Sequence, residues 1–228
     1  MKQNIVIATI KSVNIQNFRQ LCDERYNFIL ITQKDELNAQ NLNHLKPEFI
    51  FFPHWSWIIP PEIYENFNCV IFHTSDLPFG RGGSPIQNLI TRGIYKTKIT
   101  ALKAVQELDA GDVYLKCDVD LSDGNMDEIL TRISDVIFTK MIPQIIAENI
   151  VATPQIGEAV SFKRRTPAQS DLATLNKPNL RQIYDFVRML DGEGYPRAFL
   201  QIDGYKIELS KAKFQDGKIT GRFEINEK

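Results

Sequence analysis

The chain has 228 residues, of which 43% are hydrophobic and 24% charged, and its formal net charge is −1. This length suits one large domain, or a core with a small appendage, and the balanced charge argues against a general attraction to nucleic acid or to anionic membranes. No apolar run approaches the roughly 20 residues that cross a bilayer, so we expect no membrane partner and a cytoplasmic location. Cys22, Cys69 and Cys117 form no CxxC pair, which argues against a disulfide framework or a metal site.

Strand-like and helix-like stretches alternate through the first part of the chain. Strands are predicted at 4–10, 26–33, 47–53 and 69–73, and helices at 13–24, 36–45, 60–67 and 84–93. The strands are apolar almost throughout, which is typical of a parallel sheet covered on both faces. The alternation therefore predicts a doubly wound α/β core.

Two further strands are predicted at 96–105 and 111–121, followed by a long helix over 122–149. Asp123 or Asn125 can cap this helix, and Pro143 is expected to kink it. We place the boundary of the core near residue 150, which divides the chain into a 1–150 core and a small 151–228 α+β subdomain. In the latter we expect a strand and basic loop at 159–172, a helix at 179–191, and an antiparallel meander over 197–225 with Asp-Gly turns at 203–204 and 216–217.

His73 is one of only three histidines and stands at the end of the strand predicted at 69–73. Ligands of doubly wound sheets bind beyond the carboxyl ends of the strands, and an imidazole there can exchange protons near neutral pH. The Gly-rich loop after it can bring backbone N–H groups close to a ligand. The alternative is a structural histidine that is satisfied by a backbone carbonyl.

The stretch "ELDAGD" (107–112) places Asp109 and Asp112 in a tight turn between two predicted strands. Asp and Gly are common in turns for local reasons alone. If the turn lies beside His73, a carboxylate would favour the charged imidazole, which is the pairing used in acid–base catalysis.

Together, "HTSDLPFGRGGSPIQ" and "KITALKAVQELDAGDV" resemble two motifs of the formyltransferase family that uses 10-formyltetrahydrofolate. The resemblance covers roughly residues 45–121 and implies a Rossmann-like formyltransferase core. The tail stretches "RRTPAQSD" and "FVRMLDGEGYPRAF" resemble sugar N-formyltransferases, and "ATIKSVNI" and "PHWSWIIP" resemble their pseudaminic-acid-pathway branch. The implied enzyme moves a formyl group from N10-formyltetrahydrofolate to the primary amine of a nucleotide-linked amino sugar, with no nucleic acid partner and no metal.

The resemblance assigns the chemistry to His73 and Asp109, with direct attack of the amine and a tetrahedral intermediate. The family's Asn two residues before the histidine is replaced by Ile71, which cannot donate a hydrogen bond to the oxyanion. His54, Ser75 and Asn88 are the polar residues considered for that role.

The resemblance also implies two sets of binding residues. Folate contacts are expected from a cleft lined by Trp57, Ile58, Ile59, Ser75, Leu77, Pro78, Gly83, Gln106, Leu108 and Asp112. Contacts to the acceptor and its diphosphate are expected from His54, Arg81, Lys163, Arg164 and Arg165, because Arg pairs well with phosphate oxygens. For the last three residues the alternative is a solvated basic turn.

Three alternatives stay open. Two keep the donor and change the acceptor to glycinamide ribonucleotide or to methionyl-tRNA. A tRNA enzyme would be expected to show more basic character and a larger C-terminal domain, and a purine enzyme to lack the 164–167 segment and the meander. The third, motivated by Ile71, is a binding protein for folate or a nucleotide sugar without catalysis. A homodimer through the C-terminal hairpins is also an expectation.

Overall fold

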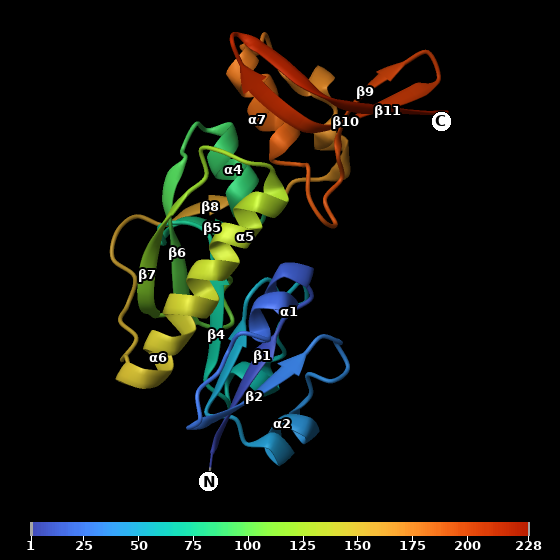
Figure 1. Ribbon diagram of the computed structural model, residues 1–228. Helices are drawn as coiled ribbons and strands as arrows, with labels where there is room; N and C mark the ends of the chain where they lie inside the picture. The colour runs from blue at the N-terminus through green and yellow to red at the C-terminus, as the bar shows by residue number, and fades with distance from the viewer. Residues whose placement is uncertain (1, 228) are drawn as a thin grey trace. The chain divides into compact units, whose positions relative to one another are not determined.

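The computed structural model describes residues 2–227, and its largest sheet has six strands (Figure 1). Their order is β2-β1-β3-β4-β6-β7, with bounds β1 Gln3–Ala8, β2 Tyr26–Ile31, β3 Phe49–Phe52, β4 Cys69–His73, β6 Lys96–Lys103 and β7 Val113–Asp120. The pairs among β2, β1, β3 and β4 are parallel, whereas β4 and β6 are antiparallel with His73 opposite Thr100. The expected α/β class with a mostly parallel sheet is confirmed.

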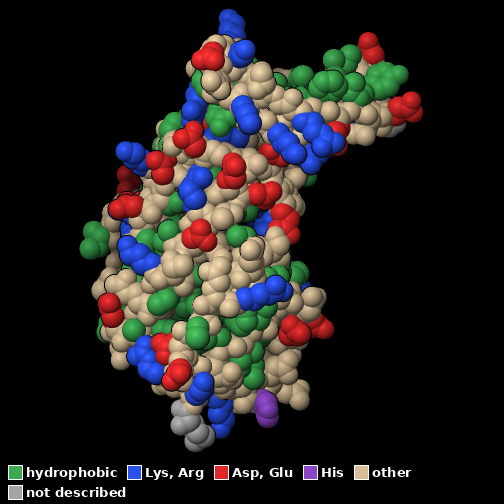
Figure 2. All heavy atoms as spheres, viewed as in Figure 1, with side chains coloured by type: hydrophobic (Ala, Val, Ile, Leu, Met, Phe, Trp, Pro, Cys, Tyr) green, Lys and Arg blue, Asp and Glu red, His purple; other side chains and the backbone are tan. Residues whose placement is uncertain are grey.

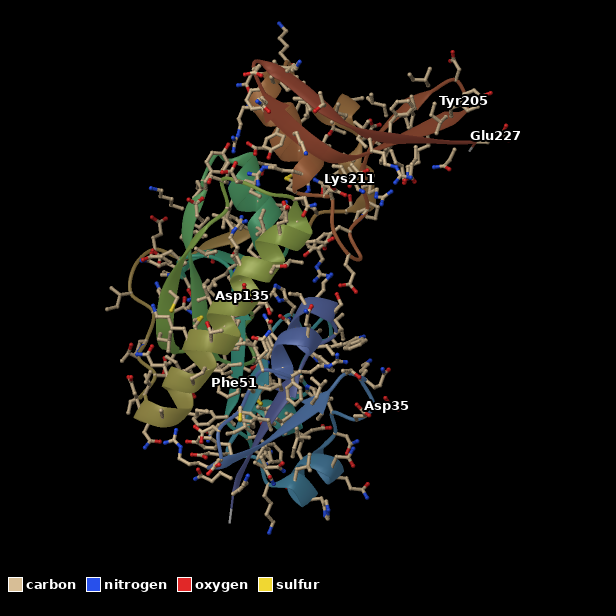
Figure 3. All side chains as sticks on the ribbon, in the orientation of Figure 1. Asp35, Phe51, Asp135, Tyr205, Lys211 and Glu227 are labelled. Atoms are coloured by element: carbon tan, nitrogen blue, oxygen red, sulfur yellow. The ribbon has the colours of Figure 1, made fainter. Side chains whose placement is uncertain are left out.

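The two faces of this sheet carry different apolar sets because side chains alternate along each strand. Val6 and Phe52 pack in one cluster with Leu42 of α2 (Ala39–Leu45) and Ile63 of α3 (Pro61–Tyr64). Phe51, which is fully buried on the neighbouring position of β3, stacks on Phe49 and Phe72 instead (Figure 3). Burial of each such side chain contributes about 1.5–3 kcal/mol, so the strands form a rigid support for their carboxyl ends.

The long helix predicted at 122–149 is divided in the structure. It comprises α5 (Met126–Val136), a π-helical turn (Ile137–Met141) and α6 (Ile142–Glu148). Asn125 caps α5, because Asn125 Oδ1 accepts from the Glu128 N–H while Glu128 Oε2 accepts from the Asn125 N–H. The π-helical turn ends at Met141, two residues before Pro143, which lacks the N–H that a continuous α-helix needs. Asn17 of α1 (Ser12–Phe18) donates to Ser134 and Asp135 of α5 at 2.9 Å each, and Figure 3 labels Asp135.

A short two-stranded sheet follows β4, and only one of its strands was predicted. Strand β5 (Phe79–Gly82) pairs with β8 (Val160–Phe162), whereas the stretch after His73 was expected to be a loop throughout. Strand β5 has only four residues, two of them glycine, and so carries too little apolar periodicity to be recognised. Strand β8 lies where a strand was predicted, at the start of the 159–172 stretch. Helix α4 (Pro85–Thr91) follows β5.

The C-terminal sheet has the predicted antiparallel meander in the order β11-β10-β9. Its strands are β9 (Ala198–Ile202), β10 (Tyr205–Gln215) and β11 (Lys218–Glu227), joined at the two Asp-Gly pairs, where all four residues have positive φ. A bulge interrupts β10 near Lys211, whose N–H donates to Asp191 (Figure 3). Helix α7 (Leu180–Arg188) begins with an Asn179–Gln182 capping box and follows two 3-10 turns, Pro167–Ser170 and Leu172–Thr174.

Packing divides the chain into two compact units that interleave along the sequence. The first runs to Gly82 and adds Lys98–Val119 and Thr131–Ser161, and the second contains Gly83–Thr97, Asp120–Leu130 and the chain from Phe162 onward. The domain boundary near residue 150 stays a prediction. Within residues 2–227, no helix is long and apolar enough to cross a membrane.

Candidate active site

His73 closes β4 and is held from two sides. Its side chain is buried, with Nε2 2.7 Å from the carbonyl oxygen of Gly80 and Nδ1 3.4 Å from Oδ2 of Asp109. The second distance exceeds the usual hydrogen-bond length of about 2.9 Å, so this contact is electrostatic when the ring is charged. Both neighbours are acceptors, so the ring can satisfy both only when both of its nitrogens carry hydrogen.

Asp109 reaches His73 from the turn between β6 and β7. Its backbone is left-handed, with φ of 54°, and its Oδ2 accepts the N–H of Gly82 at 2.8 Å. The turn passes so close to β6 that a Cβ on Gly111 would lie 2.1 Å from the carbonyl oxygen of Lys103. Glycine at 111 therefore allows the close approach that brings the carboxylate of Asp109 to His73.

The loop between His73 and β5 is anchored by several hydrogen bonds. The hydroxyl of Thr100 donates to the carbonyl of Ser75 at 2.7 Å, and Lys116 donates to Asp76 and to the carbonyl of Leu77 at 2.5 Å each. The N–H of Val160 donates to the carbonyl of Pro78 at 3.1 Å. The loop that leads from His73 to Gly80 of β5 is thus tied to β6, β7 and β8.

Residues expected to contact folate differ in their surroundings. Ile58 is 91% exposed, Leu108 66% and Trp57 37%, and Gln106 is exposed as well. Ile59 packs against the sheet core, Asp112 is half-buried, and Ser75 and Leu77 are buried. These residues and Pro78 belong to the first unit together with His73 and Asp109.

Gly83 belongs to the second unit, and its lack of a side chain has a packing cause. A Cβ there would lie 2.4 Å from Cβ and 2.6 Å from Cα of Arg164. The main chains at 83 and 164 therefore approach too closely for any other residue. The Gly83 N–H donates to the carbonyl of Phe162 at 3.2 Å.

The three basic residues of the 163–165 stretch also lie in the second unit. Lys163 and Arg164 are exposed, whereas Arg165 is half-buried and lies over the Phe186 ring, and burial lowers its pKa. Arg165 and Ser170 help to line a cavity of about 140 Å³ in this unit. The basic stretch is therefore not one uniform solvated turn.

The polar residues considered in place of the missing Asn have other partners. Asn88 donates to the carbonyls of Gly83, Ser84 and Lys163, and the hydroxyl of Ser75 lies 3.4 Å from the carbonyl of Gly80. His54 Nδ1 lies 3.2 Å from the side-chain nitrogen of Asn14. Ile71, two residues before His73 in β4, is on the same face of the strand as His73.

Arg81 and Gln155 meet beside the Asp109 turn. Oε1 of Gln155 accepts from Nε of Arg81 at 3.2 Å and from Nη2 at 3.0 Å, and Arg81 Nη1 lies 3.1 Å from Glu107. The side-chain nitrogen of Gln155 donates to the carbonyls of Asp109 and Gly111. Gln155 could not be predicted, since a single glutamine in a stretch without periodicity gives no signal.

Family models match two parts of the chain. A model described as formyl transferase matches residues 5–146, and one described as the C-terminal domain of methionyl-tRNA formyltransferase matches residues 167–226. The methionyl-tRNA formyltransferase of Bacillus licheniformis is 26% identical over 186 residues, which cover 79% of the chain and 58% of that protein. The chain therefore spans a little over half the length of this relative.

Solved structures give a sharper comparison. The structure of methionyl-tRNA formyltransferase from Clostridium thermocellum is 51% identical with a TM-score of 0.95, covering 99% of this chain and 100% of that one. HypX from Aquifex aeolicus, solved in complex with tetrahydrofolic acid, has a TM-score of 0.76 at 17% identity, covering 96% of this chain and 40% of that one. A sugar N-formyltransferase from a Shewanella species has a TM-score of 0.63 at 15% identity, covering 96% of each chain. The last two likenesses show a shared fold.

These comparisons correct the expected acceptor. The nucleotide-linked amino sugar, the pseudaminic-acid branch and the absence of a nucleic acid partner were wrong, because the 51% identical structure is a methionyl-tRNA formyltransferase while the sugar enzyme is a distant neighbour. The tail motifs were therefore assigned to the wrong branch. The formyltransferase resemblance itself is confirmed, and with it the formyl donor of that family, N10-formyltetrahydrofolate.

Proposed function

The chain belongs to the formyl transferase family, and from that premise we propose that it transfers a formyl group from N10-formyltetrahydrofolate to the amino group of methionyl-tRNA. The observation that carries this proposal is the 51% identity over 99% of the chain with the Clostridium thermocellum methionyl-tRNA formyltransferase. The match of residues 167–226 to the C-terminal domain of such enzymes supports the same acceptor. The cytoplasmic location stays a prediction.

The reaction forms one C–N bond and breaks another. The methionyl amine bonds to the formyl carbon, the bond between that carbon and N10 of the folate breaks, the amine loses a proton and N10 gains one. His73 is the group proposed to stabilise negative charge on the formyl oxygen or to pass the proton to N10. Asp109, with Oδ2 3.4 Å from Nδ1, is proposed to hold the ring in orientation.

The environment of His73 limits how it can act. Nε2 already faces the carbonyl of Gly80 at 2.7 Å, so the substrate must replace that carbonyl as the partner of Nε2. Ile71 on the same strand face offers no donor. We therefore assign oxyanion stabilisation to His73, with no second side chain from β4.

Exposed apolar side chains on the Asp109 turn and on the loop after β3 suit the donor. Val105 and Leu108, 42% and 66% exposed, flank the turn that carries Asp109, and Ile58 is exposed on the loop after β3. A flat pterin with polar edges fits a site made of apolar walls and backbone groups. Contacts from Trp57, Gln106 and Asp112 remain part of this proposal.

The first test measures tetrahydrofolate release with N10-formyltetrahydrofolate and methionyl-tRNA, alongside dTDP-, UDP- and CMP-linked amino sugars. We expect turnover with methionyl-tRNA and none with the sugars. His73→Ala and Asp109→Asn should each lower kcat about 10²- to 10⁴-fold, because general acid–base and charge stabilisation are lost. His44→Ala, which alters an exposed histidine of α2, is the matched control.

Folate binding without turnover on any acceptor would instead support the non-catalytic alternative that Ile71 raises. Wild-type rates in the His73 or Asp109 variant would contradict the assigned mechanism even if the acceptor is right.

A further inference from the structure

A segment between the two family matches, which we call the strap, is bound both beside the Asp109 turn and to the loop that follows His73. We use this term for residues 151–160, which lie after the first match ends at 146 and before the second begins at 167. Thr153 pairs with Val113 through hydrogen bonds of 2.7 and 2.9 Å, at the start of β7. Seven residues on, Val160 bonds to Pro78 in the loop before β5. The strap therefore links the Asp109 turn to the segment that holds His73.

Gln155 lies in the middle of the strap and uses its whole amide. Nε2 donates to the carbonyl of Asp109 at 2.8 Å and to that of Gly111 at 2.9 Å, while Oε1 accepts twice from Arg81. Two donors and two acceptor sites are all that a glutamine amide has. The orientation is unambiguous, because the carbonyls can only accept and the guanidinium can only donate.

These contacts close a ring around the carboxylate of Asp109. The N–H of Gly82 binds Oδ2 of Asp109, and the preceding residue, Arg81, binds Gln155. Gln155 in turn binds the carbonyl of Asp109 itself. Side chain and main chain of Asp109 are thus held by adjacent residues of β5, one directly and one through Gln155. This matters because the left-handed backbone of Asp109 is a conformation that L-residues adopt only with support.

We propose that Gln155 is a positioning residue that sets the distance between Asp109 and His73. The role rests on the proposed function, since it acts through the catalytic pair. Arg81 serves the same ring, with three guanidinium nitrogens engaged by Gln155 and Glu107.

The test compares Gln155→Met, Gln155→Glu and Gln144→Met. The first variant loses every contact of the amide. The second keeps an acceptor for Arg81 but places a carboxylate oxygen against two carbonyls. The third makes the same change at a glutamine of α6 whose amide donates to Glu148. Both Gln155 variants should lower kcat about 10- to 100-fold with little change in KM, because misplacement of a catalytic group acts on the chemical step. Gln144→Met should keep the wild-type kcat.

A double-mutant cycle separates positioning from general damage. If Gln155 acts through Asp109, the Asp109→Asn/Gln155→Met enzyme is no slower than Asp109→Asn alone. An additional 10-fold loss in the double variant, or wild-type kcat in both Gln155 variants, would overturn the proposal. Thermal unfolding identifies a variant that fails to fold, in which case Gln155→Glu carries the cycle.

A second readout does not need turnover. The amide hydrogen of Gly82, which binds Asp109, should exchange with solvent at least about 10-fold faster in Gln155→Met than in wild type or Gln144→Met. Unchanged exchange would overturn the ring. If wild type does not formylate methionyl-tRNA while exchange at Gly82 accelerates, the proposed function fails and the ring stands.

Discussion

His54 illustrates how one side chain is controlled by its surroundings. It follows β3 with a left-handed backbone, φ of 57°, and contacts the buried Asn14. Burial, and to a lesser degree the charge of Lys11, lowers the pKa of His54 to about 4. The imidazole is therefore neutral at pH 7, which suits a hydrogen-bonding role better than the phosphate contact expected from the sequence.

This pKa predicts a pH-dependent stability. An unfolded histidine titrates near 6.5, so between pH 6.5 and 4 the unfolded chain binds a proton that the folded chain does not. The free energy of unfolding therefore decreases as the pH is lowered through this range. The full stability is present above pH 6.5, and the loss reaches up to about 3 kcal/mol by pH 4. Urea unfolding of wild type and His54→Asn across this range measures it, because Asn tolerates positive φ and the carboxylates common to both proteins cancel. Parallel stability curves would contradict the assignment.

Single residues also show what the sequence can predict. The proximity of His73 and Asp109 follows from rules about strand ends and turns, and the structure places them 3.4 Å apart, while their roles stay predictions. Gln155 was invisible because its contacts depend on how an irregular segment crosses two loops. Neither apolar periodicity nor turn chemistry records such contacts.

At the scale of elements, a buried ion pair within α7 binds the chain before α5. Asp185 accepts from Arg188 at 2.6 Å, from Tyr95 at 2.6 Å and from Arg181 at 3.0 Å. Arg188 is fully buried and also donates to the carbonyls of Leu121 and Gly124. The helix and the chain before α5 are thus joined by charge-assisted hydrogen bonds.

Asp185→Asn should lower the free energy of unfolding by about 3–5 kcal/mol, because it leaves the guanidinium of Arg188 buried without its counter-charge. Replacing both partners, in Asp185→Asn/Arg188→Met, should recover part of this loss. Asp23→Asn, at an exposed pair with Arg25, should have little effect. Equal losses in the single and double variants would show that the buried charge is not the cause.

Elements with strong local signals were predicted well. The Asp-Gly hairpins, the Asn179 cap and the apolar strands each have a local chemical cause in the sequence. Strand β5 does not, since two of its four residues are glycine. Local propensity thus accounts for the main elements, and tertiary contact decides the short ones.

At the scale of the molecule, net charge proved a poor guide to the acceptor. The value of −1 argues against a tRNA substrate only if charge is spread evenly, because it sums charges over the whole chain. On the face shown in Figure 2, basic and acidic side chains are interspersed. Because the net charge is a sum, a local group of basic residues can still meet phosphates while the net charge of the whole chain stays near zero.

A tRNA acceptor predicts a strong dependence on salt. Plots of log kcat/KM for methionyl-tRNA against log salt concentration should be linear with negative slope, because phosphate contacts release counterions. Lys163→Ala and Arg164→Ala should each make the slope shallower by about 1. Lys2→Ala, just before β1 and so at the edge of the sheet opposite His73, is the control. Identical slopes in all four proteins would exclude the 163–164 pair from phosphate binding.

The interleaved units have a consequence for building chimaeras from related enzymes. Residues 167–226 match a family model as though they were a separable module, yet their unit also draws on 83–97 and 120–130. A graft of that tail alone would deprive Arg188 of the carbonyls of Leu121 and Gly124 from its own parent, and Asp185 of the hydroxyl of Tyr95. Recombination that exchanges all three segments together keeps these bonds within one parent.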